Sequence, residues 1–244
     1  MNQQQHHQVD QTRVAEIRDR FGRARDRVEK ACARTGRDPG EVTIVAVTKR
    51  HAPVVIASAH AAGIDHVGEN YAQEMRDKLA ELGPLGSQLT WHFVGRLQRN
   101  KVKYVAGHAG LIHAVDSASL AREIARRAAK MQLTQRVLIA VNVGGEEQKG
   151  GVSPEDAGAL LATIAELDGI EPAGLMTMPP LAASPEDNRG HFRALVALRD
   201  RLRTPDRPLA ELSMGTTDDF EVAVEEGATL VRIGTAIFGP RPAG

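Results

Sequence analysis

Short β-branched runs alternate with helical stretches along most of this sequence, and the alternation is its strongest constraint on fold. Eight runs have the composition and length of strands: residues 43–48, 66–68, 90–94, 111–115, 136–142, 171–176, 211–214 and 230–233. Most gaps between them can hold a helix, the clearest being 117–131, 154–167, 189–203 and 218–226. This order predicts a parallel sheet with right-handed crossovers. Eight repeats in 244 residues favour a single closed (β/α)8 TIM barrel, with an open doubly wound sheet as the alternative.

An extra helix is expected before the first strand. Between residues 11 and 35, apolar residues recur at steps of three and four: Val14, Ile17, Phe21, Ala24, Val28 and Ala31. Gly36 is a natural stop for this helix. Since little chain follows the last strand, the helix at 11–35 is expected to cover that part of the barrel wall. For the helix at 154–167, Ser153 is the expected N-cap and Pro154 the first helical residue.

Composition excludes several classes of protein. The 31 Lys and Arg residues balance 31 Asp and Glu residues, which argues against nucleic acid or a membrane surface as partner. The single cysteine, Cys32, cannot form an internal disulfide, and no Cys/His cluster has metal-site spacing. The N-terminus is polar, and no run reaches the ~20 apolar residues of a membrane span. We expect a cytoplasmic protein with a disordered tail at 1–10 and one domain at 11–244.

The end of the first strand carries a lysine, Lys49. In a parallel barrel the C-terminal strand ends meet on one face, where active sites lie. Because Lys49 follows an apolar run, its stem is expected to be buried and its amine to lie at the barrel mouth. With Arg50 beside it, the amine is expected to have a lowered pKa and nucleophilic character. The alternative is a lysine that begins a solvent-exposed loop.

The last two strands both end in glycine turns with hydroxyl side chains. Residues 213–217 read Ser-Met-Gly-Thr-Thr, and residues 232–236 read Arg-Ile-Gly-Thr-Ala. Backbone N–H groups at such turns bind phosphate, and many barrels have a phosphate site at these two strand ends. A lone glycine turn could be structural, but two at these positions favour a phosphate site.

Other polar residues near the strand ends are less specific. Asn70 follows the second strand and His92 lies within the third; each can equally satisfy the core, which for His92 alone is the favoured interpretation. A local basic face follows: Arg96, Arg99, Lys101 and Lys103. Such a face is either solvated or binds an anionic partner.

Several catalytic motifs are absent from the sequence: GxxxxGK[ST], GxGxxG, GxSxG and HExxH. A lysine facing a phosphate cradle remains. Two chemistries use that pair, namely pyridoxal phosphate (PLP) held on a lysine and class I aldolase chemistry on a sugar phosphate.

At these residues the sequence resembles the YggS/PROSC family of PLP homeostasis proteins, whose fold is like the barrel domain of alanine racemase. The similar segments are VAVTK (45–49), GENYAQE (68–74), WHFVGRLQRNK (91–101), NVGGEEQKGGV (142–152), GLMTM (174–178) and residues 213–239. They extend over nearly the whole chain after the first helix. The chain departs from the family's usual pattern at Thr48, where serine is common, and at Thr216 and Thr217, where Met-Ser is common.

The resemblance implies a set of PLP-binding residues. Lys49 would form the aldimine with the cofactor aldehyde. Ser213, Gly234 and Thr235 would hold the phosphate. Arg232 would face the pyridine nitrogen, where a guanidinium disfavours ring protonation and weakens the ring as an electron sink. Asn70 and His92 would line the pocket near the ring.

The resemblance predicts a monomeric carrier or buffer of PLP in vitamin B6 homeostasis, without robust catalysis, whose recipients are apo-enzymes that need PLP. The family lacks the second domain that gives alanine racemase its opposing base. The alternative is a racemase-like or aldolase-like enzyme, for which Tyr71, Tyr104 and His92 are the candidate acid/base groups. A third possibility is an interaction module that uses the basic face at 96–103.

Overall fold

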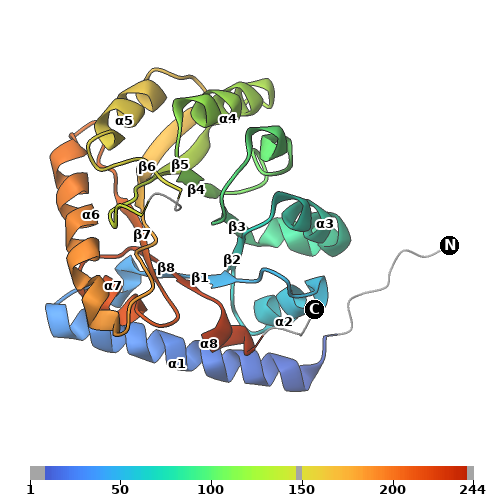
Figure 1. The fold of residues 1–244 in the computed structure, drawn as a ribbon. Helices are drawn as coiled ribbons and strands as arrows, with labels where there is room; N and C mark the ends of the chain where they lie inside the picture. Colours follow the sequence, from blue (N-terminus) through green and yellow to red (C-terminus); the bar gives the residue numbers. More distant parts are fainter. Residues whose placement is uncertain (1–8, 147–149, 241–244) are drawn as a thin grey trace.

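Eight parallel strands close into a barrel in chain order (Figure 1). The computed structural model describes residues 9–146 and 150–240. The strands are β1 (Thr43–Val47), β2 (His66–Glu69), β3 (Thr90–Phe93), β4 (Leu111–Val115), β5 (Gln135–Ala140), β6 (Ile170–Met176), β7 (Glu211–Thr216) and β8 (Leu230–Ile233). Closure is made by β1 and β8, which pair from Thr43 with Leu230 to Ala46 with Ile233. The closed barrel is therefore confirmed, and the open sheet is excluded.

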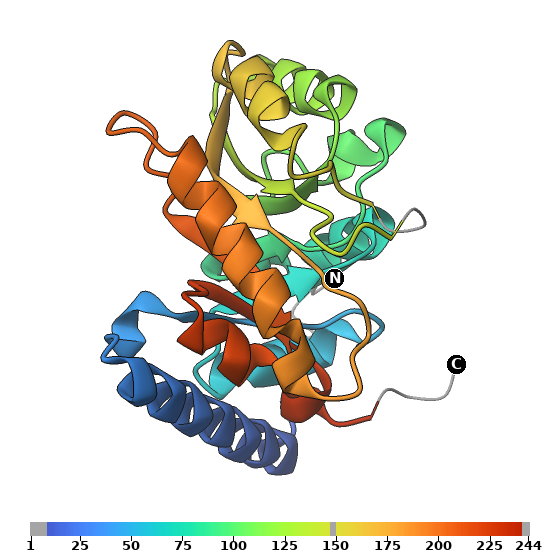
Figure 2. The same ribbon diagram turned by 60° about the vertical axis from the view of Figure 1, so that its left-hand side comes forward.

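Helices cover the outside of the barrel. They are α1 (Gln11–Thr35), α2 (Pro53–Ala61), α3 (Ala72–Leu82), α4 (Ala118–Lys130), α5 (Ala157–Ala165), α6 (Arg189–Leu202), α7 (Phe220–Glu225) and α8 (Thr235–Phe238). Short 3-10 segments occur at η1 (Pro39–Glu41), η2 (Gly83–Gln88), η3 (Arg99–Tyr104) and η4 (Pro185–Asn188). Between β3 and β4, η3 stands in place of an α-helix. Figure 2 shows α6 crossing the outer surface, where it contacts β6 and β7.

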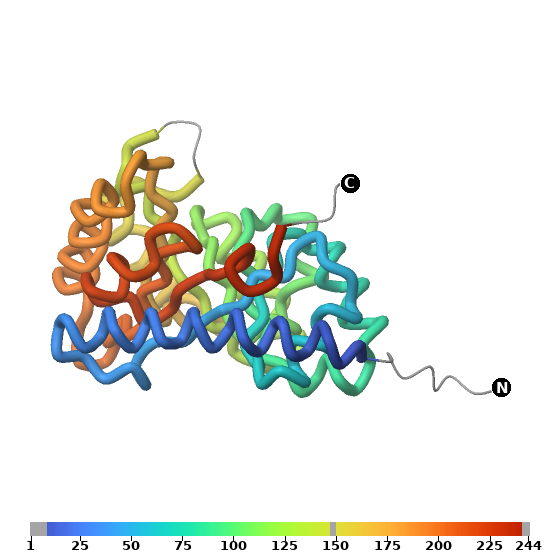
Figure 3. Tube along the Cα trace, turned by 90° about the horizontal axis from the view of Figure 1, so that it is seen from below, coloured from blue at the N-terminus to red at the C-terminus, as the bar shows by residue number. Residues whose placement is uncertain are grey.

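The long helix α1 takes the place of a full-length last helix. Its N-cap Asp10 accepts a hydrogen bond from Thr12 N at 2.9 Å, and Gly36 ends it with a φ of 69°. α1 contacts α2, α7 and the four-residue α8, and it runs along this side of the barrel (Figure 3). An ion pair of 2.6 Å joins Arg27 of α1 to Glu221 of α7. The expectation that this helix covers the wall after the last strand is confirmed.

One helix start was wrongly predicted. α5 begins at Ala157, not at Pro154, and Asp156 stands at its N-cap. The reason is that Val152 still pairs with Val141 in a parallel bridge, which keeps the chain extended up to Ser153. Ser153 Oγ then accepts a hydrogen bond from Asp156 N at 3.1 Å and closes a turn ahead of the helix.

The predicted disordered tail at 1–10 lies mostly outside the described residues. Its last residue, Asp10, is the N-cap of α1. Within residues 9–146 and 150–240, no helix has both the length and the apolar character that crossing a bilayer requires.

The barrel has two packing layers because side chains alternate along each strand. The outer layer lies between strands and helices and holds large apolar groups such as Trp91 and Phe93. The inner layer contains a small apolar cluster: Val45, Leu111, Ala114, Leu138, Ala140, Ala173, Met176 and Leu230. Polar side chains complete the interior, and they include His92, His113, Ser213 and Arg232, each at most 5% exposed.

Candidate functional site

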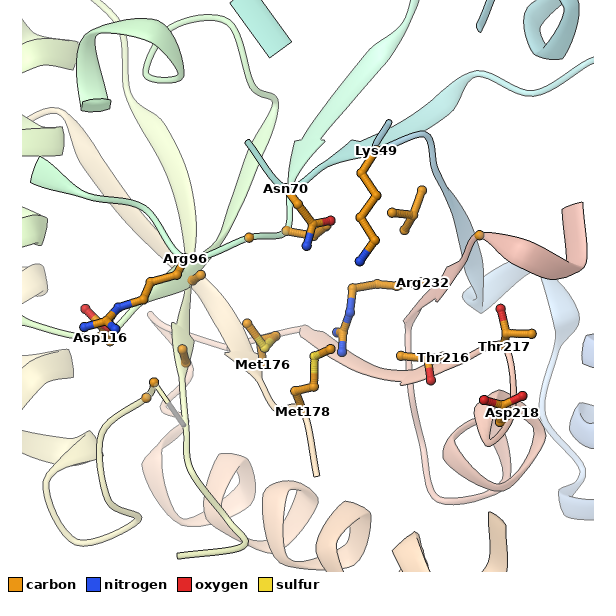
Figure 4. Close-up of a pocket in the computed structure, with 18 of the residues that line it drawn as sticks. Lys49, Asn70, Arg96, Asp116, Met176, Met178, Thr216, Thr217, Asp218 and Arg232 are labelled. Atoms are coloured by element: carbon orange, nitrogen blue, oxygen red, sulfur yellow. The ribbon is translucent and has the colours of Figure 1, made fainter. Parts of the chain in front are cut away.

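A pocket of about 530 Å³ opens at the C-terminal ends of the strands, within the size range of small-molecule sites. Residues at or just after the ends of all eight strands line it. Figure 4 shows Lys49, Asn70 and Arg232 directed into the same space, with Thr216 and Thr217 to one side. The expectation that the strand ends build a single site therefore agrees with the geometry.

Lys49 follows β1 and is half-buried, and its amine points into the pocket (Figure 4). The preceding residue, Thr48, makes hydrogen bonds to β2 through both its backbone and its side chain. Thr48 N donates to Gly68 O at 2.9 Å, and Thr48 Oγ1 donates to Glu69 Oε1 at 2.5 Å. The chain then turns at Arg50, which has a φ of 64° and donates its N–H to Glu74 Oε1 at 2.5 Å. These contacts set the direction in which the lysine stem leaves the strand.

A buried ion pair outside the pocket contacts the end of β1. Lys78 Nζ lies 2.6 Å from Glu69 Oε1, 2.6 Å from Glu74 Oε1 and 2.8 Å from Thr48 O. Burial raises the pKa of Glu69, and the charge of Lys78 opposes that rise. Lys78 was not predicted, because nothing in the sequence tells which carboxylate a lysine of α3 will meet.

Arg232 lies at the floor of the pocket and is 5% exposed. Its Nη1 donates to Ser213 Oγ at 2.5 Å and its Nη2 to Thr177 O at 2.9 Å. Burial lowers the pKa of Arg232 to about 10, and the charge of Asp219 acts in the opposite direction. At neutral pH the group is therefore a buried cation with donors fixed in place.

The two glycine turns meet beside this cation. Thr216, Thr217, Gly234 and Thr235 all line the pocket. Gly215 lies at the end of β7 with a φ of 87°, and a Cβ there would lie 2.9 Å from Phe220 Cα, so this strand end requires glycine. Hydroxyl and backbone donors at two turns beside a guanidinium form a site suited to a phosphate group.

Asn70 supplies a polar atom that the protein itself does not satisfy. Its Oδ1 is buried and has no hydrogen-bond partner among the described residues. The backbone of Asn70 packs against Gly95, where a Cβ would come 2.1 Å from Asn70 O. An unpaired buried acceptor in a pocket wall is costly unless a ligand supplies a donor.

Two predicted site residues, Ser213 and His92, do not line this pocket. β7 continues to Thr216, two residues beyond its predicted end, so the turn hydroxyls in the pocket are Thr216 and Thr217. Ser213 instead lies inside the barrel, 0% exposed. Val94, directly after β3, reaches the pocket, whereas His92 lies one inward position deeper in the strand and is 3% exposed.

The predicted basic face is divided between two environments. Arg96, Arg99 and Lys101 line a second, polar groove of about 620 Å³, which shares Asn70, Arg96 and Asp116 with the first pocket. Lys103 lies elsewhere, with its Nζ 4.9 Å from the ring centre of Tyr104.

Comparison with known proteins assigns the chain to a family. The family model described as "Alanine racemase, N-terminal domain" matches residues 21–242. A pyridoxal phosphate homeostasis protein of Aquifex aeolicus is 48% identical over 224 residues, which cover 91% of this chain and 97% of the relative. The chain belongs to the pyridoxal phosphate homeostasis proteins.

Solved structures agree with this assignment. A Bifidobacterium adolescentis protein of unknown function superposes with a TM-score of 0.87 at 37% identity, covering 94% of this chain and 97% of its own. PipY of Synechococcus elongatus, solved with PLP bound, gives a TM-score of 0.77 at 33% identity, covering 91% of this chain and 100% of its own.

Proposed function

We propose that this protein holds PLP in the strand-end pocket through Lys49, and that it serves as a carrier or buffer of the cofactor in the cytoplasm. The observation that carries the proposal is the convergence of Lys49, the buried cation Arg232 and two hydroxyl-bearing glycine turns on one pocket. The family assignment and the PLP-bound relative support the same ligand.

The residues present fit the cofactor. Bound PLP supplies an aldehyde that condenses reversibly with a primary amine, and a ring that can withdraw electrons. Lys49 provides the amine. Thr216, Thr217, Gly234 and Thr235 provide donors for the phosphate. The unsatisfied Asn70 Oδ1 provides an acceptor for a ligand hydroxyl.

Arg232 would bind near the pyridine nitrogen and keep that nitrogen unprotonated. A guanidinium donates hydrogen bonds and has no acceptor, and at neutral pH it gives up no proton. The ring is then a weaker electron sink than one paired with a carboxylate. This arrangement favours retention of the cofactor over turnover.

The positions of the candidate acid/base groups also favour binding over catalysis. A racemase needs a second proton-transfer group opposite the lysine. Tyr71 lines the neighbouring groove, Tyr104 packs against Arg76 and Lys103, and His92 is enclosed in the barrel. None of the three is among the residues that line the pocket.

Absorbance and chemical trapping test the proposal. The purified full chain mixed with PLP is expected to develop a yellow absorbance band, and borohydride is expected to fix a phosphopyridoxyl group on the peptide that contains Lys49. Lys49→Ala is expected to lose the band and the adduct but to bind PLP more weakly through the phosphate contacts. Lys130→Arg, a control at an exposed lysine of α4, is expected to keep the adduct at Lys49. An adduct on other lysines only would refute the proposal.

Delivery is tested with a recipient. PLP-loaded protein is mixed with an apo-enzyme that needs PLP, and reactivation is compared with free PLP at equal concentration. Faster reactivation supports delivery to apo-enzymes. Reactivation no faster than with loaded Lys49→Ala would limit the role to storage.

A further inference from the structure

A row of hydrogen-bonded polar side chains crosses the barrel interior beneath the pocket. It begins at Arg232, whose Nη1 lies 2.5 Å from Ser213 Oγ. Ser213 Oγ lies 2.8 Å from His113 Nδ1. His113 Nε2 lies 2.9 Å from His92 Nδ1, and His92 Nε2 lies 3.0 Å from His66 Nδ1. His66 is the first residue of β2, at the end of the barrel opposite the pocket.

The guanidinium determines the direction of every hydrogen bond in this row. Arg232 can only donate, so Ser213 Oγ accepts from it. The other hydrogen-bond partner of Ser213 Oγ among the described residues is His113 Nδ1, so the buried hydroxyl donates its proton there. His113 then carries its proton on Nε2 and donates to His92. His92 likewise carries its proton on Nε2 and donates to His66. The reverse order would leave the Ser213 proton unpaired in a fully buried site.

The three imidazoles are neutral dipoles in this arrangement. Each presents its lone pair toward Arg232 and its N–H away from it, which is the orientation that stabilises a buried positive charge. Burial is the main cause that lowers the pKa of His113 well below its ordinary value and that of His92 to about 3. A neutral row is therefore maintained at physiological pH.

We propose that Ser213, His113, His92 and His66 form a positioning relay that orients Arg232 and compensates its charge, since no carboxylate of residues 9–146 or 150–240 forms an ion pair with it. The inference rests on the proposed function, because it explains how the pocket keeps an unpaired cation for the pyridine nitrogen of PLP. Ser213 and His92 therefore act through Arg232, and His66 extends the row to the far end of the barrel.

Charged groups near the far end set the environment of His66. Asp65 and Glu211 favour its protonated form, and Arg136 disfavours protonation of His92. Asp65 Oδ1 lies 3.1 Å from His60 Nδ1, and Glu211 Oε1 accepts a hydrogen bond from Arg136 Nη2 at 3.2 Å. Burial outweighs the two carboxylates and lowers the pKa of His66.

The first test needs no cofactor. Nitrogen-15 histidine labelling of the full chain, with two-bond nitrogen–proton spectra, reports the tautomer of each ring. We expect His113 and His92 as neutral Nε2–H tautomers from neutral pH down to about pH 5. Assignment comes from loss of one signal set in His113→Asn and in His92→Asn. An Nδ1–H tautomer or a protonated ring at either position would overturn the relay.

The second test separates positioning from structural support. His66→Leu removes the last acceptor, whereas His66→Asn keeps an acceptor atom in place of Nδ1. With the row disrupted, Arg232 is less compensated and the pocket becomes more positive. We therefore expect His66→Leu to lower the pH midpoint of the bound-PLP absorbance by about half a unit or more, and His66→Asn to restore it.

The outcomes distinguish this inference from the proposed function. If the wild-type chain fails to bind PLP, the proposed function is refuted. The relay is still tested in that case, because the tautomer spectra need no PLP. If PLP binds and both His66 variants share the wild-type midpoint, the relay does not act on the pocket and the inference is refuted. Chemical unfolding of each variant shows whether a midpoint shift occurs in a folded protein.

Discussion

Lys78 Nζ lies 2.6 Å from Glu69 Oε1, and the two side chains are only 5% and 0% exposed. This pair lies between α3 and the barrel and not in the pocket. Lys78 also donates to Thr48 O at 2.8 Å, so it holds the backbone next to the lysine that we propose binds PLP. An interaction outside the pocket thus determines where Lys49 leaves its strand.

Lys78→Met is expected to destabilise the fold by about 3–5 kcal/mol, because it leaves the Glu69 carboxylate buried without its cation. Chemical denaturation at neutral pH measures the loss. The double variant Lys78→Met/Glu69→Leu removes both charges and is expected to be more stable than Lys78→Met alone. A double variant as unstable as the single one would show that packing, not the uncompensated charge, accounts for the effect.

Most of the barrel can be predicted from the sequence, because each strand is a short apolar run followed by a turn. The eight predicted strands match β1 to β8 within two residues at either end. The predicted helix at 11–35 matches α1 in full, since its apolar period and its Gly36 stop are local signals. The start of α5 was wrong because a long-range bridge between Val141 and Val152 competes with the local cap signal.

Fewer of the site residues could be predicted, because the register of the strands and the position of their ends decide which side chains reach the pocket. Lys49, Asn70 and Arg232 line the pocket as expected. The family resemblance gave Ser213 a phosphate role, but β7 continues to Thr216, and the hydroxyls that line the pocket are those of Thr216 and Thr217. The meeting of His66, His92 and His113 depends on the register of β2, β3 and β4, which sequence spacing alone does not give.

Gly95→Ala is expected to displace the pocket wall. The added Cβ would lie 2.1 Å from Asn70 O and 2.7 Å from Asn70 Cα, and this backbone cannot yield as a flexible side chain would. We expect a stability loss of about 1–3 kcal/mol and weaker PLP binding. Thermal unfolding and absorbance titration measure the two effects. Gly22→Ala in α1 is the matched control, because an added Cβ would meet no described atom within 4 Å beyond its own stretch of helix, and helix propensity favours alanine. Wild-type PLP affinity in Gly95→Ala would contradict the role assigned to Asn70.

Asp219 links the turn after β7 to the charge of Arg232. Its Oδ1 accepts from Thr216 N at 2.7 Å, and its Oδ2 accepts from Asn188 Nδ2 at 2.8 Å. Asp219→Asn keeps an acceptor for Thr216 but removes the charge, whereas Asp219→Ala removes both. We expect a larger stability loss in Asp219→Ala, by about 1–2 kcal/mol, since it leaves buried donors unpaired. Urea unfolding of both variants checks this, and equal losses would assign the effect to charge alone.

Acid is expected to destabilise the apo-protein at a higher pH than carboxylate titration would explain. His92 has an ordinary pKa of 6.5 when unfolded and about 3 when folded, mainly because of burial. Between these values the unfolded chain binds more protons, so the free energy of unfolding falls as pH falls below 6.5. The pKa values of His66 and His113 are also lowered, so both add to the slope. His92 alone contributes up to about 1.4 kcal/mol per pH unit. Urea unfolding between pH 6.5 and 5 measures the slope before most carboxylates titrate. His92→Asn is expected to flatten it, and the exposed His108→Gln is the matched control for the loss of a histidine. An equal slope in His92→Asn and the wild type would show that His92 is not buried in its neutral form.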